Sequence, residues 1–556
     1  MYIVSVLVEH PVQSLDMTFD YLSHESLLKG VRVFVRFGYQ KIIGYVEDVK
    51  ETALSKTELE QQAGFHYQYI QEVIDQEPLL NEELQQLALQ LSKLTLSPRI
   101  ACLQAMLPSQ LKPSTNHSVG LKLQTVACFL QEGKAKTKKQ QECLDYLKTH
   151  SPTPIKDIPY SKNILDQLVK QGLIEYQKQE VYRKPLDFFQ TTNQDIILTN
   201  DQQKVVDGII AHPKRVALLH GVTGSGKTEV YLALARHFLN KQKSVMMLVP
   251  EISLTPMMVK VFKERFGEQV AILHSRLSQG EKYDEYRRIK RQEVKIVVGA
   301  RSAVFAPLEN IGLIILDEEH DGSFKQQDGW RYHARDLGVV LAQKLNIPIL
   351  LGSATPSLES VNNVQNGKYH HLVLSKRAGN ATALRQFVID LKHQRIQNGL
   401  SKPLLKRMQE HLEKGNQVLL FLNRRGFAPV LLCHECGWID ECHHCEKPYT
   451  YHQHQRVLRC HHCGAQKRVP MQCGHCGSTH LVTTGLGTEQ LEETLKARFP
   501  QYNIARIDRD STARKGKLEG YLEDIQQGKS QILIGTQMLA KGHHFPNVTL
   551  VALVNV

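Results

Sequence analysis

Residues 216–228 read VALLHGVTGSGKT, an apolar run that leads into a glycine-rich loop. The loop fits the pattern G-x-x-x-x-G-K-[ST], whose backbone N–H groups wrap phosphate at the start of a helix. Lys227 is expected to reach the β- and γ-phosphates, and Thr228 to hold Mg²⁺. A strand before the loop and a helix after it predict an α/β fold. The residues expected to bind the nucleotide are Gly221, Val222, Thr223, Gly224, Ser225, Gly226, Lys227 and Thr228.

A second nucleotide motif, Asp317-Glu-Glu-His320, follows the apolar run 313–316. A carboxylate at the carboxyl end of a strand, beside a phosphate loop, can hold Mg²⁺ through water, and Asp317 is predicted to take that role. Glu318 can orient and deprotonate the attacking water. Lys227, Asp317 and Glu318 are therefore the predicted catalytic residues. Gln202, upstream of the loop, is predicted to read the adenine edge.

Apolar runs of strand length alternate with helical segments from about residue 198. One set lies at residues 216–219, 245–249, 296–298, 313–316 and 349–351, and a second at 417–422, 504–507, 532–534 and 550–554. Continuous apolar runs suit parallel strands that are buried on both faces. We therefore predict a multidomain α/β protein with two RecA-like P-loop lobes, residues 195–375 and 376–556.

A small β-rich domain is predicted over residues 1–105. Its clearest strand has a period of two, which places Val31, Val33 and Val35 on one face and Arg32 and Phe34 on the other.

A winged-helix domain is predicted over residues 115–182, after a Pro/Ser-rich linker at 108–117. A helix at 138–150, a second helix at 164–170 and a following strand have this pattern. The segment shows no base-reading surface, so contact with DNA and contact with protein are equally suitable roles.

Eight of the eleven cysteines form four Cys-x-x-Cys pairs within a module predicted at residues 430–480, inserted in the second lobe. Each pair can place two thiolates on one tetrahedral metal, so four pairs supply two Cys₄ zinc sites. Disulfides or a redox dithiol fit less well, because the pairs are regular and the chain shows no secretion signal. Spacing leaves three ways of pairing open. The module is suited equally to a structural role and to partner docking.

The overall composition indicates which kind of partner the protein binds and in which cellular compartment it lies. Lys and Arg number 69 against 56 Asp and Glu, a formal charge of +13, which favours a polyanion such as nucleic acid. No apolar run reaches membrane-spanning length, and the amino terminus lacks a charged region before its apolar stretch. We therefore expect a cytoplasmic protein without a membrane partner.

Four further segments resemble the coupling motifs of superfamily 2 helicases. They are residues 299–302, 352–355, 421–426 and 535–542, and the second of these comprises Gly352, Ser353, Ala354 and Thr355. Together with residues 221–231, 317–336, 423–438 and 485–490 and the cysteine pairs, they make the chain similar to the PriA family of bacterial replication-restart DNA helicases. The resemblance covers nearly the whole chain.

This resemblance implies an ATP-dependent 3′→5′ DNA helicase that recognises stalled or abandoned forks and D-loops and initiates primosome assembly. The implied cofactors are ATP, Mg²⁺ and two Zn²⁺. The implied partners are forked DNA, D-loops, single-stranded DNA, single-stranded-DNA-binding protein and other primosome proteins, with the chain as a monomer. It implies nested zinc sites: Cys433, Cys436, Cys473 and Cys476 on one ion, and Cys442, Cys445, Cys460 and Cys463 on the other.

Residues 323–336 resemble the family's aromatic-rich DNA loop. Phe324, Trp330 and Tyr332 could stack on bases, and Lys325, Arg331 and Arg335 could contact phosphate. His320 and Gln326 are the predicted relays to the water-activating carboxylate. The alternative is a partly buried aromatic turn.

The family also holds the 3′ end of a nascent strand in its amino-terminal domain. The matching residues are Phe19, Asp20, Tyr21 and Gly38. An aromatic ring can stack on the terminal base, and a carboxylate can accept a hydrogen bond from the 3′-hydroxyl. The residues alone would favour core positions for Phe19 and Tyr21.

Two other readings of the function remain open. One is a fork-binding scaffold for primosome assembly with weak or no helicase activity, and the other is an RNA helicase, which does not account for the zinc module. The family continues beyond the apolar run at 550–554 with an arginine-bearing helix that completes the ATP site. We therefore expect a shortened chain that binds DNA and nucleotide but hydrolyses ATP poorly.

Overall fold

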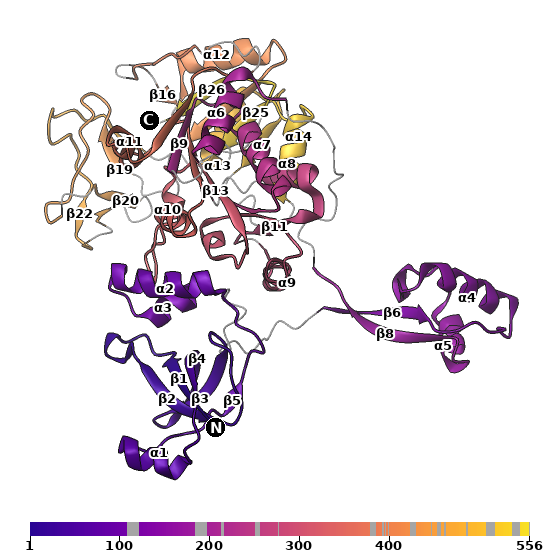
Figure 1. Cartoon of the computed structure of the whole chain (residues 1–556). Helices are drawn as coiled ribbons and strands as arrows, with labels where there is room; N and C mark the ends of the chain where they lie inside the picture. Colours follow the sequence, from indigo (N-terminus) through magenta and orange to yellow (C-terminus); the bar gives the residue numbers. More distant parts are fainter. Residues whose placement is uncertain are drawn as a thin grey trace. The chain divides into compact units, whose positions relative to one another are not determined.

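The chain divides into two compact units in a computed structural model (Figure 1). The first unit comprises Met1–Leu254 and Val259–Asn380, and the second comprises Thr255–Met258 and Ala381–Val556. The structure describes residues 1–107, 122–183, 197–212, 216–250, 256–275, 277–378, 385–391, 394, 396–397, 400–422, 430–445, 448–452, 457–460, 463–484, 488–507, 517–535 and 545–554. The predicted domain boundaries stay predictions.

A five-stranded antiparallel sheet begins the first unit, in the order β2-β1-β4-β3-β5. Its strands are β1 (Tyr2–Val8), β2 (Thr18–Ser23), β3 (Arg32–Phe37), β4 (Gln40–Glu51) and β5 (Glu72–Val73). The predicted alternation in β3 is confirmed, because Val33 and Val35 lie in a buried cluster with Val4 and Val6 of β1. On the opposite face, Arg32 is also buried.

Three helices accompany this sheet, which the β-rich prediction did not include. They are α1 (Lys56–Ala63), α2 (Glu82–Thr95) and α3 (Arg99–Met106). Leu87 of α2 and Leu103 of α3 are buried in the same cluster as Leu7 and Tyr45 of the sheet. That cluster continues into the core of the following α/β domain, where it includes Leu316.

The winged-helix arrangement is present over the described residues 122–183. Strands β6 (Leu123–Phe129), β7 (Thr153–Pro154) and β8 (Ile174–Glu180) form a sheet in the order β7-β6-β8, beside helices α4 (Lys138–His150) and α5 (Lys162–Lys170) (Figure 1). The residues of its core come mainly from α4 and α5 and include Leu144, Leu147, Leu165 and Leu168.

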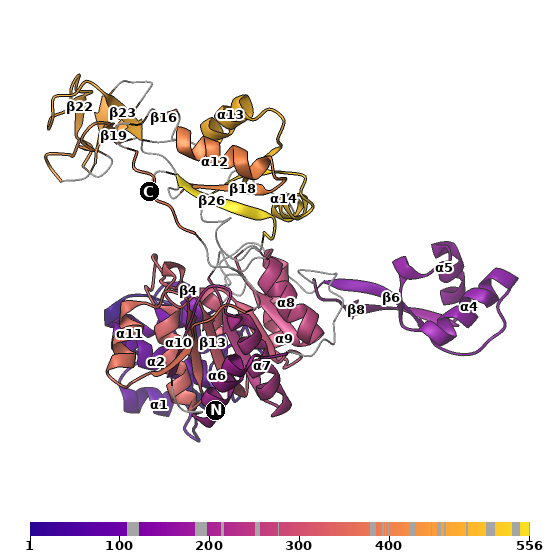
Figure 2. The ribbon, with the colours of Figure 1, turned by 90° about the horizontal axis from the view of Figure 1, so that it is seen from above.

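A seven-stranded sheet with wholly parallel pairing carries the phosphate loop, in the order β11-β12-β10-β13-β14-β9-β15. Its strands are β9 (Val216–Gly221), β10 (Ser244–Leu248), β11 (Val270–Leu273), β12 (Ile296–Gly299), β13 (Ile311–Asp317), β14 (Ile349–Ser353) and β15 (His370–Leu374). The accompanying helices are α6 (Asn200–Ala211), α7 (Lys227–Asn240), α8 (Pro256–Phe266), α9 (Gln279–Lys290), α10 (Ala334–Leu345) and α11 (Leu358–Gln365) (Figure 2). The carboxyl ends of β9, β13 and β14 therefore meet at one edge of this sheet.

The second unit contains a four-stranded parallel sheet in the order β24-β25-β18-β26. Its strands are β18 (Gln417–Leu422), β24 (Ile504–Ile507), β25 (Ile532–Gly535) and β26 (Val548–Val554). Helices α12 (Lys402–Leu412) and α13 (Thr488–Arg498) pack on one face and α14 (Lys517–Gln526) on the other (Figure 2). A short hairpin, β16 (Ile396–Gln397) and β17 (Leu400–Ser401), precedes α12.

The cysteine module is a separate five-stranded antiparallel sheet, in the order β22-β21-β20-β19-β23. Its strands are β19 (Val430–Cys433), β20 (Thr450–His452), β21 (Val457–Arg459), β22 (Gln466–Arg468) and β23 (Leu481–Thr484). It lies in sequence between β18 and α13, as predicted for an insertion. In the part of the chain that the structure describes, no helix has both the length and the apolar character needed to cross a membrane.

Candidate nucleotide, DNA and zinc sites

The phosphate loop joins β9 to α7 with glycines in conformations that other residues disfavour. Gly224 and Gly226 have φ angles of 79° and 81°, in the left-handed region. A Cβ on Gly221 would lie 2.7 Å from the Ser225 hydroxyl, so a larger residue at this position would displace the Ser225 side chain. The Lys227 ammonium donates to the Gly221 carbonyl at 3.0 Å. Among the described residues, the buried Ser225 hydroxyl has no hydrogen-bond partner, and these features fit a cradle for phosphate.

Gln202 is engaged within the protein at both ends of its amide. Its oxygen accepts from the Thr199 N–H at 2.8 Å, and its nitrogen donates to the Ser225 carbonyl at 3.0 Å. The side chain is buried and supports the phosphate loop. Adenine recognition by Gln202 stays a prediction, and it requires one of these hydrogen bonds to open.

Asp317 ends β13 and is linked directly to the helix that follows the phosphate loop. The Tyr231 hydroxyl of α7 donates to Asp317 Oδ1 at 2.8 Å. Burial raises the pKa of Asp317 to about 6, and the neighbouring Glu318 carboxylate adds to that shift, while Tyr231 and Lys227 oppose it. The structure thus places Lys227 and Asp317 close enough for their charges to interact.

Glu318 and His320 face the motif at residues 352–355. Glu318 has a φ of 48°, and its carboxylate lies 3.6 Å from His320 Nδ1. That ring contacts the Ser353 hydroxyl at 2.8 Å through Nδ1 and the Thr355 hydroxyl at 3.4 Å through Nε2. The predicted relay His320 therefore touches two of the predicted coupling residues. The other two are Gly352, which is buried, and Ala354, which is half-buried.

Glu319 is a site residue that the sequence reasoning missed. Its side chain has no exposed surface, and its carboxylate accepts hydrogen bonds from the Ser357 N–H, the Ser357 and Ser360 hydroxyls, and Arg335 Nη1. Three consecutive acidic residues look alike in the sequence, and nothing in their spacing shows that the first and third are buried while Glu318 is partly exposed.

The aromatic loop departs from its prediction at two of its three rings. Phe324 has no exposed surface and Tyr332 is 7% exposed, because both pack in the core of the α/β domain. Neither ring can stack on a base in this conformation, so the alternative of a buried aromatic turn holds for both. Trp330 is half-buried against Phe305, and its indole N–H donates to the Thr95 hydroxyl of α2 at 3.2 Å.

The cations of this loop also divide into two groups. Lys325 and Arg331 are exposed, as phosphate contacts require, and the Lys325 ammonium donates to the Arg331 carbonyl at 2.7 Å. Arg335 was predicted to join them, but it is mostly buried and forms ion pairs with Glu319 and Asp336 at 3.1 and 2.9 Å. The Gln326 amide donates to the Asp328 carbonyl at 2.9 Å, within the loop.

The residues predicted to hold a 3′ end lie together on β2 and at the β3–β4 turn. Phe19 is half-buried and packs edge-to-face on Phe37, with ring centroids 4.9 Å apart. Asp20 is exposed and accepts from the Ser5 hydroxyl at 2.6 Å. Gly38 is exposed with a φ of 60°. Tyr21 is buried and its hydroxyl donates to the Arg36 carbonyl at 3.1 Å, so this ring is a core residue.

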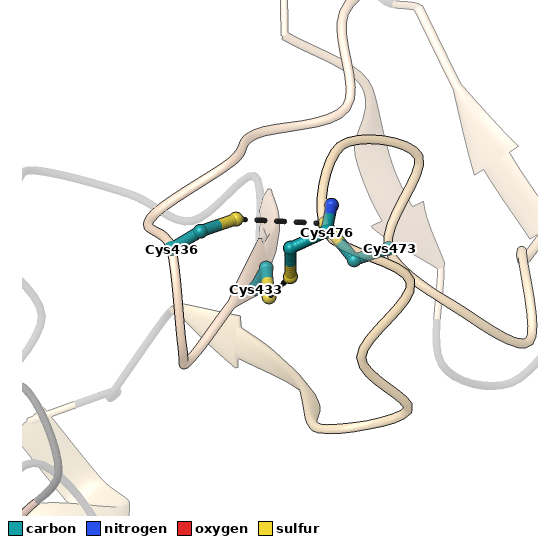
Figure 3. Close-up of side chains that lie close together, drawn as sticks. All are labelled: Cys433, Cys436, Cys473 and Cys476. Atoms are coloured by element: carbon teal, nitrogen blue, oxygen red, sulfur yellow. Dashed lines mark hydrogen bonds between the residues drawn. The ribbon is translucent and has the colours of Figure 1, made fainter.

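The eight module cysteines form two groups of four, paired as the family resemblance implies. The first group is Cys433, Cys436, Cys473 and Cys476 (Figure 3). The Cys433 sulfur lies 3.6 Å from the Cys476 sulfur, and the Cys436 sulfur lies 3.6 Å from the Cys473 sulfur. In Cys442, Cys445, Cys460 and Cys463 the corresponding distances are 3.5 and 3.3 Å. Four thiolates at about 2.3 Å from a tetrahedral Zn²⁺ lie roughly 3.8 Å from one another, so both groups fit zinc.

Several predicted motifs lie wholly or partly outside the described residues. They are the segments at 421–426, 423–438, 485–490 and 535–542, of which the structure describes only residues 421–422, 430–438, 488–490 and 535.

Three family models match separate parts of the chain. Residues 5–108 match the 3′ DNA-binding domain of PriA, 199–364 match the DEAD/DEAH box helicases, and 442–468 match the Cys-rich region of the PriA DNA helicase. The replication restart protein PriA of Bacillus subtilis is 36% identical over 642 residues, covering 100% of this chain and 78% of that protein. The chain belongs to the PriA family of replication restart proteins.

Two further PriA proteins support this assignment. That of Chlamydia pneumoniae is 35% identical over 96% of this chain and 73% of its own length. That of Haemophilus influenzae is 64% identical over 77% of this chain, and the matched part spans 60% of its own length. This PriA-family chain thus combines a helicase domain, a 3′ DNA-binding domain and zinc-binding cysteine clusters.

Solved structures of other helicases are similar only in general outline. RecG bound to a three-way DNA junction matches with 14% identity and a TM-score of 0.34, covering 70% of this chain and 40% of RecG. Mss116p bound to single-stranded RNA and AMP-PNP matches with 15% identity and a TM-score of 0.38, covering 65% and 64%. Similarity at this level carries no argument about function.

Proposed function

We propose that this chain is an ATP-dependent 3′→5′ DNA helicase that recognises stalled or abandoned replication forks and D-loops and initiates primosome assembly. The observation that carries the proposal is the hydrogen bond from Tyr231 to Asp317, at 2.8 Å. It joins the helix that begins in the phosphate loop to the acidic motif at the same sheet edge. Hydrolysis requires both motifs around one triphosphate.

In this proposal the residues of the phosphate loop hold ATP. The backbone N–H groups of residues 221–228 surround the phosphates at the start of α7, and Lys227 leaves the Gly221 carbonyl to contact the β- and γ-phosphates. Thr228 and Asp317 would hold Mg²⁺, which would supply positive charge beside the phosphates. Glu318 orients the attacking water and accepts its proton.

DNA contact in this proposal involves two surfaces. Phe19 stacks on the terminal base of a nascent strand, Asp20 accepts from its 3′-hydroxyl, and the Gly38 backbone leaves room for the sugar and phosphate. Lys325 and Arg331 contact the phosphates of single-stranded DNA, and the half-buried Trp330 is the one ring of the predicted three with an accessible edge.

The cysteine module is proposed to hold two Zn²⁺ and to meet single-stranded-DNA-binding protein and other primosome proteins. The described residues of the module have a buried cluster of their own, which is separate from the two clusters on the faces of the parallel sheet in the second unit. Zinc thiolates persist in a reducing compartment, which agrees with a bacterial cytoplasmic protein that acts at forks.

Replacing Lys227 tests the proposal. We expect Lys227→Ala to lower fork-stimulated ATP hydrolysis by about 100-fold or more, since one phosphate-stabilising group is lost, while fork affinity is unchanged. Lys204→Ala, an exposed lysine of α6, is the matched control and should leave both properties intact. A chain that binds forks and primosome proteins equally well with or without Lys227, and shows no hydrolysis to lose, would be a fork-binding scaffold instead.

A further inference from the structure

A short segment that follows β15 runs along the phosphate loop. Strand β15 lies next to β9 in the parallel sheet, with Leu374 opposite Gly221 at the point where the loop begins. Beyond Leu374 the chain continues beside the loop, and the Ala378 N–H donates to the Gly224 carbonyl at 2.8 Å. The strand pairing and this hydrogen bond fix residues 374–378 against the loop from two points.

Within this segment, the side chain of Arg377 lies against a glycine of the loop. A Cβ on Gly224 would lie 4.0 Å from Arg377 Cγ, so the aliphatic part of the arginine occupies the face where a larger residue would carry its side chain. Arg377 is exposed, and its guanidinium forms no hydrogen bond or ion pair with any residue that the structure describes. The charged end of this side chain is therefore available to a ligand of the loop.

Arg377 and the acidic motif lie on opposite sides of the phosphate loop. In the sheet, β13 with Asp317 at its end lies on one side of β9, and β15 lies on the other. Lys227 is the single charged residue among residues 221–228. A guanidinium matches the geometry of phosphate with two parallel N–H donors, which suits arginine to recognition of phosphate. A second cation at the side away from Asp317 would add to the charge that Lys227 supplies.

We propose that Arg377 is a further nucleotide-contacting residue, whose guanidinium holds the phosphate chain of ATP from the side opposite Asp317. This inference rests on the proposed function and deepens it, because it assigns a second cation to the ligand of the phosphate loop. Arg377 lies beyond residues 199–364, which match the DEAD/DEAH box helicases, so that match does not assign it a role. Its role follows from its place beside Gly224.

Calorimetric titration of the whole chain tests the contact with two ligands, ATP and tripolyphosphate, each with Mg²⁺. Tripolyphosphate has the phosphate chain and lacks the base and the sugar. At about 0.15 M salt, which screens distant charges, Arg377→Met should weaken both ligands by about 10-fold, because a hydrogen bond between charged groups is lost. Lys376→Met is the matched control, since Lys376 is the neighbouring residue, is also exposed and carries the same charge. It should change either affinity by less than about 2-fold.

The two ligands distinguish contact with phosphate from contact with the rest of the nucleotide. If Arg377→Met weakens ATP but leaves tripolyphosphate unchanged, the guanidinium contacts the base or the sugar, and the inference is wrong. It is also wrong if neither affinity changes. Equal losses in Lys376→Met and Arg377→Met would overturn it as well, because the overall charge of the surface would then explain the effect.

Arg377→Gln decides the case if the methionine variant changes the melting temperature of the ligand-free chain. Glutamine is polar and suits an exposed position, so this variant should keep the melting temperature and lose the same factor of about 10 in affinity for both ligands. Undiminished affinity for tripolyphosphate in Arg377→Gln would refute the inference alone. An unmodified chain that binds neither ATP nor tripolyphosphate would instead refute the proposed function, and the inference with it.

Discussion

Asp317 illustrates how burial sets the chemistry of one carboxylate. Tyr231 donates to it, yet the loss of water around the buried group raises its pKa to about 6, and the adjacent Glu318 carboxylate acts in the same direction. A divalent cation bound at this position would favour the ionised form again. Without a bound metal ion, the ionised form of the Asp317 carboxylate therefore lowers the free energy of unfolding of the chain.

Asp317→Asn should stabilise the metal-free chain at neutral pH. The folded chain binds a proton at Asp317 more tightly than the unfolded chain, so stability falls as pH rises from about 4 to about 6 and stays lower above that window. Removing the charge should raise the free energy of unfolding by on the order of 3 kcal/mol at pH 7.5. The gain should shrink toward zero near pH 4. Thermal unfolding in EDTA measures it, with the exposed Asp328→Asn as control.

Asp20 should discriminate between chemical forms of a 3′ end. We expect Asp20→Ala to weaken binding of a fork with a 3′-hydroxyl by about 10-fold, since a hydrogen bond to a charged acceptor is lost. A fork that ends in a 3′-phosphate should bind equally well before and after the change. Fluorescence anisotropy with the two forks measures both affinities. Ser5→Ala removes only the donor that orients Asp20, at 2.6 Å, and should change affinity by less than about 3-fold.

Predictions for single residues differ from the structure where the same type of side chain suits both a DNA-binding position and a buried position. Aromatic rings suit base stacking and also suit a core, and the sequence could not show that Phe324 and Tyr332 are buried while Trp330 keeps an accessible edge. The resemblance of residues 323–336 to a DNA-binding loop assigns Arg335 to phosphate, and its ion-pair partner lies sixteen residues earlier in the chain, where the sequence does not mark it. Burial of that partner, Glu319, depends on helices that only the folded chain brings together.

At the scale of elements, continuous apolar runs predicted the central parallel strands well. The predicted bounds of β18, which lies inside its sheet, agree with the structure to the residue, because polar residues flank its apolar run and both faces of the strand are covered. The missed strands β11 and β15 are the edges of their sheet, where one side is unpaired. In β15 the sequence HHLVL has its polar residues inside the strand, so no apolar run marks it.

The pairing of the cysteines is likewise a property of the sheet and not of the spacing. Strands β19 and β23 pair antiparallel with Cys433 opposite Leu481, which brings the turn at 473–476 beside the turn at 433–436. The hairpin of β20 and β21 lies between them in sequence and closes the second group. The resemblance implied this nesting, whereas spacing alone left three arrangements.

Each cysteine group should hold one zinc ion independently. We expect the whole chain to release about two zinc equivalents on denaturation, and Cys433→Ser and Cys442→Ser to release about one each, because three thiolates hold zinc less tightly than four. Colorimetric zinc release measures this. The two tryptophans allow a second readout: in a Trp330→Phe background, the emission of Trp438, which packs on Gly474 beside the first group, should change with Cys433→Ser and not with Cys442→Ser.

At the scale of the whole molecule, the amino-terminal domain and the first lobe share one buried cluster. It runs from Leu87 of α2 to Leu341 of α10, and Trp330 of the aromatic loop donates to Thr95 of α2. The 3′-end domain and the nucleotide-binding lobe are therefore expected to unfold together. The parallel sheet of the second unit has cores of its own on both faces, with Leu420 in one and Leu533 in the other.

Calorimetry should accordingly separate two main unfolding transitions, and each transition should shift in response to a different ligand. ATP at about 100 times its dissociation constant should stabilise the first unit by about 2.7 kcal/mol and shift only the transition that contains the phosphate loop. A zinc chelator should lower the transition of the second unit, which contains both cysteine groups, and leave the other in place. Lys227→Ala should abolish the ATP shift without moving the chelator-sensitive transition. A single transition that responds to both ligands would show that the two units fold as one cooperative body, and would contradict the separation of their cores as the basis of independent stability.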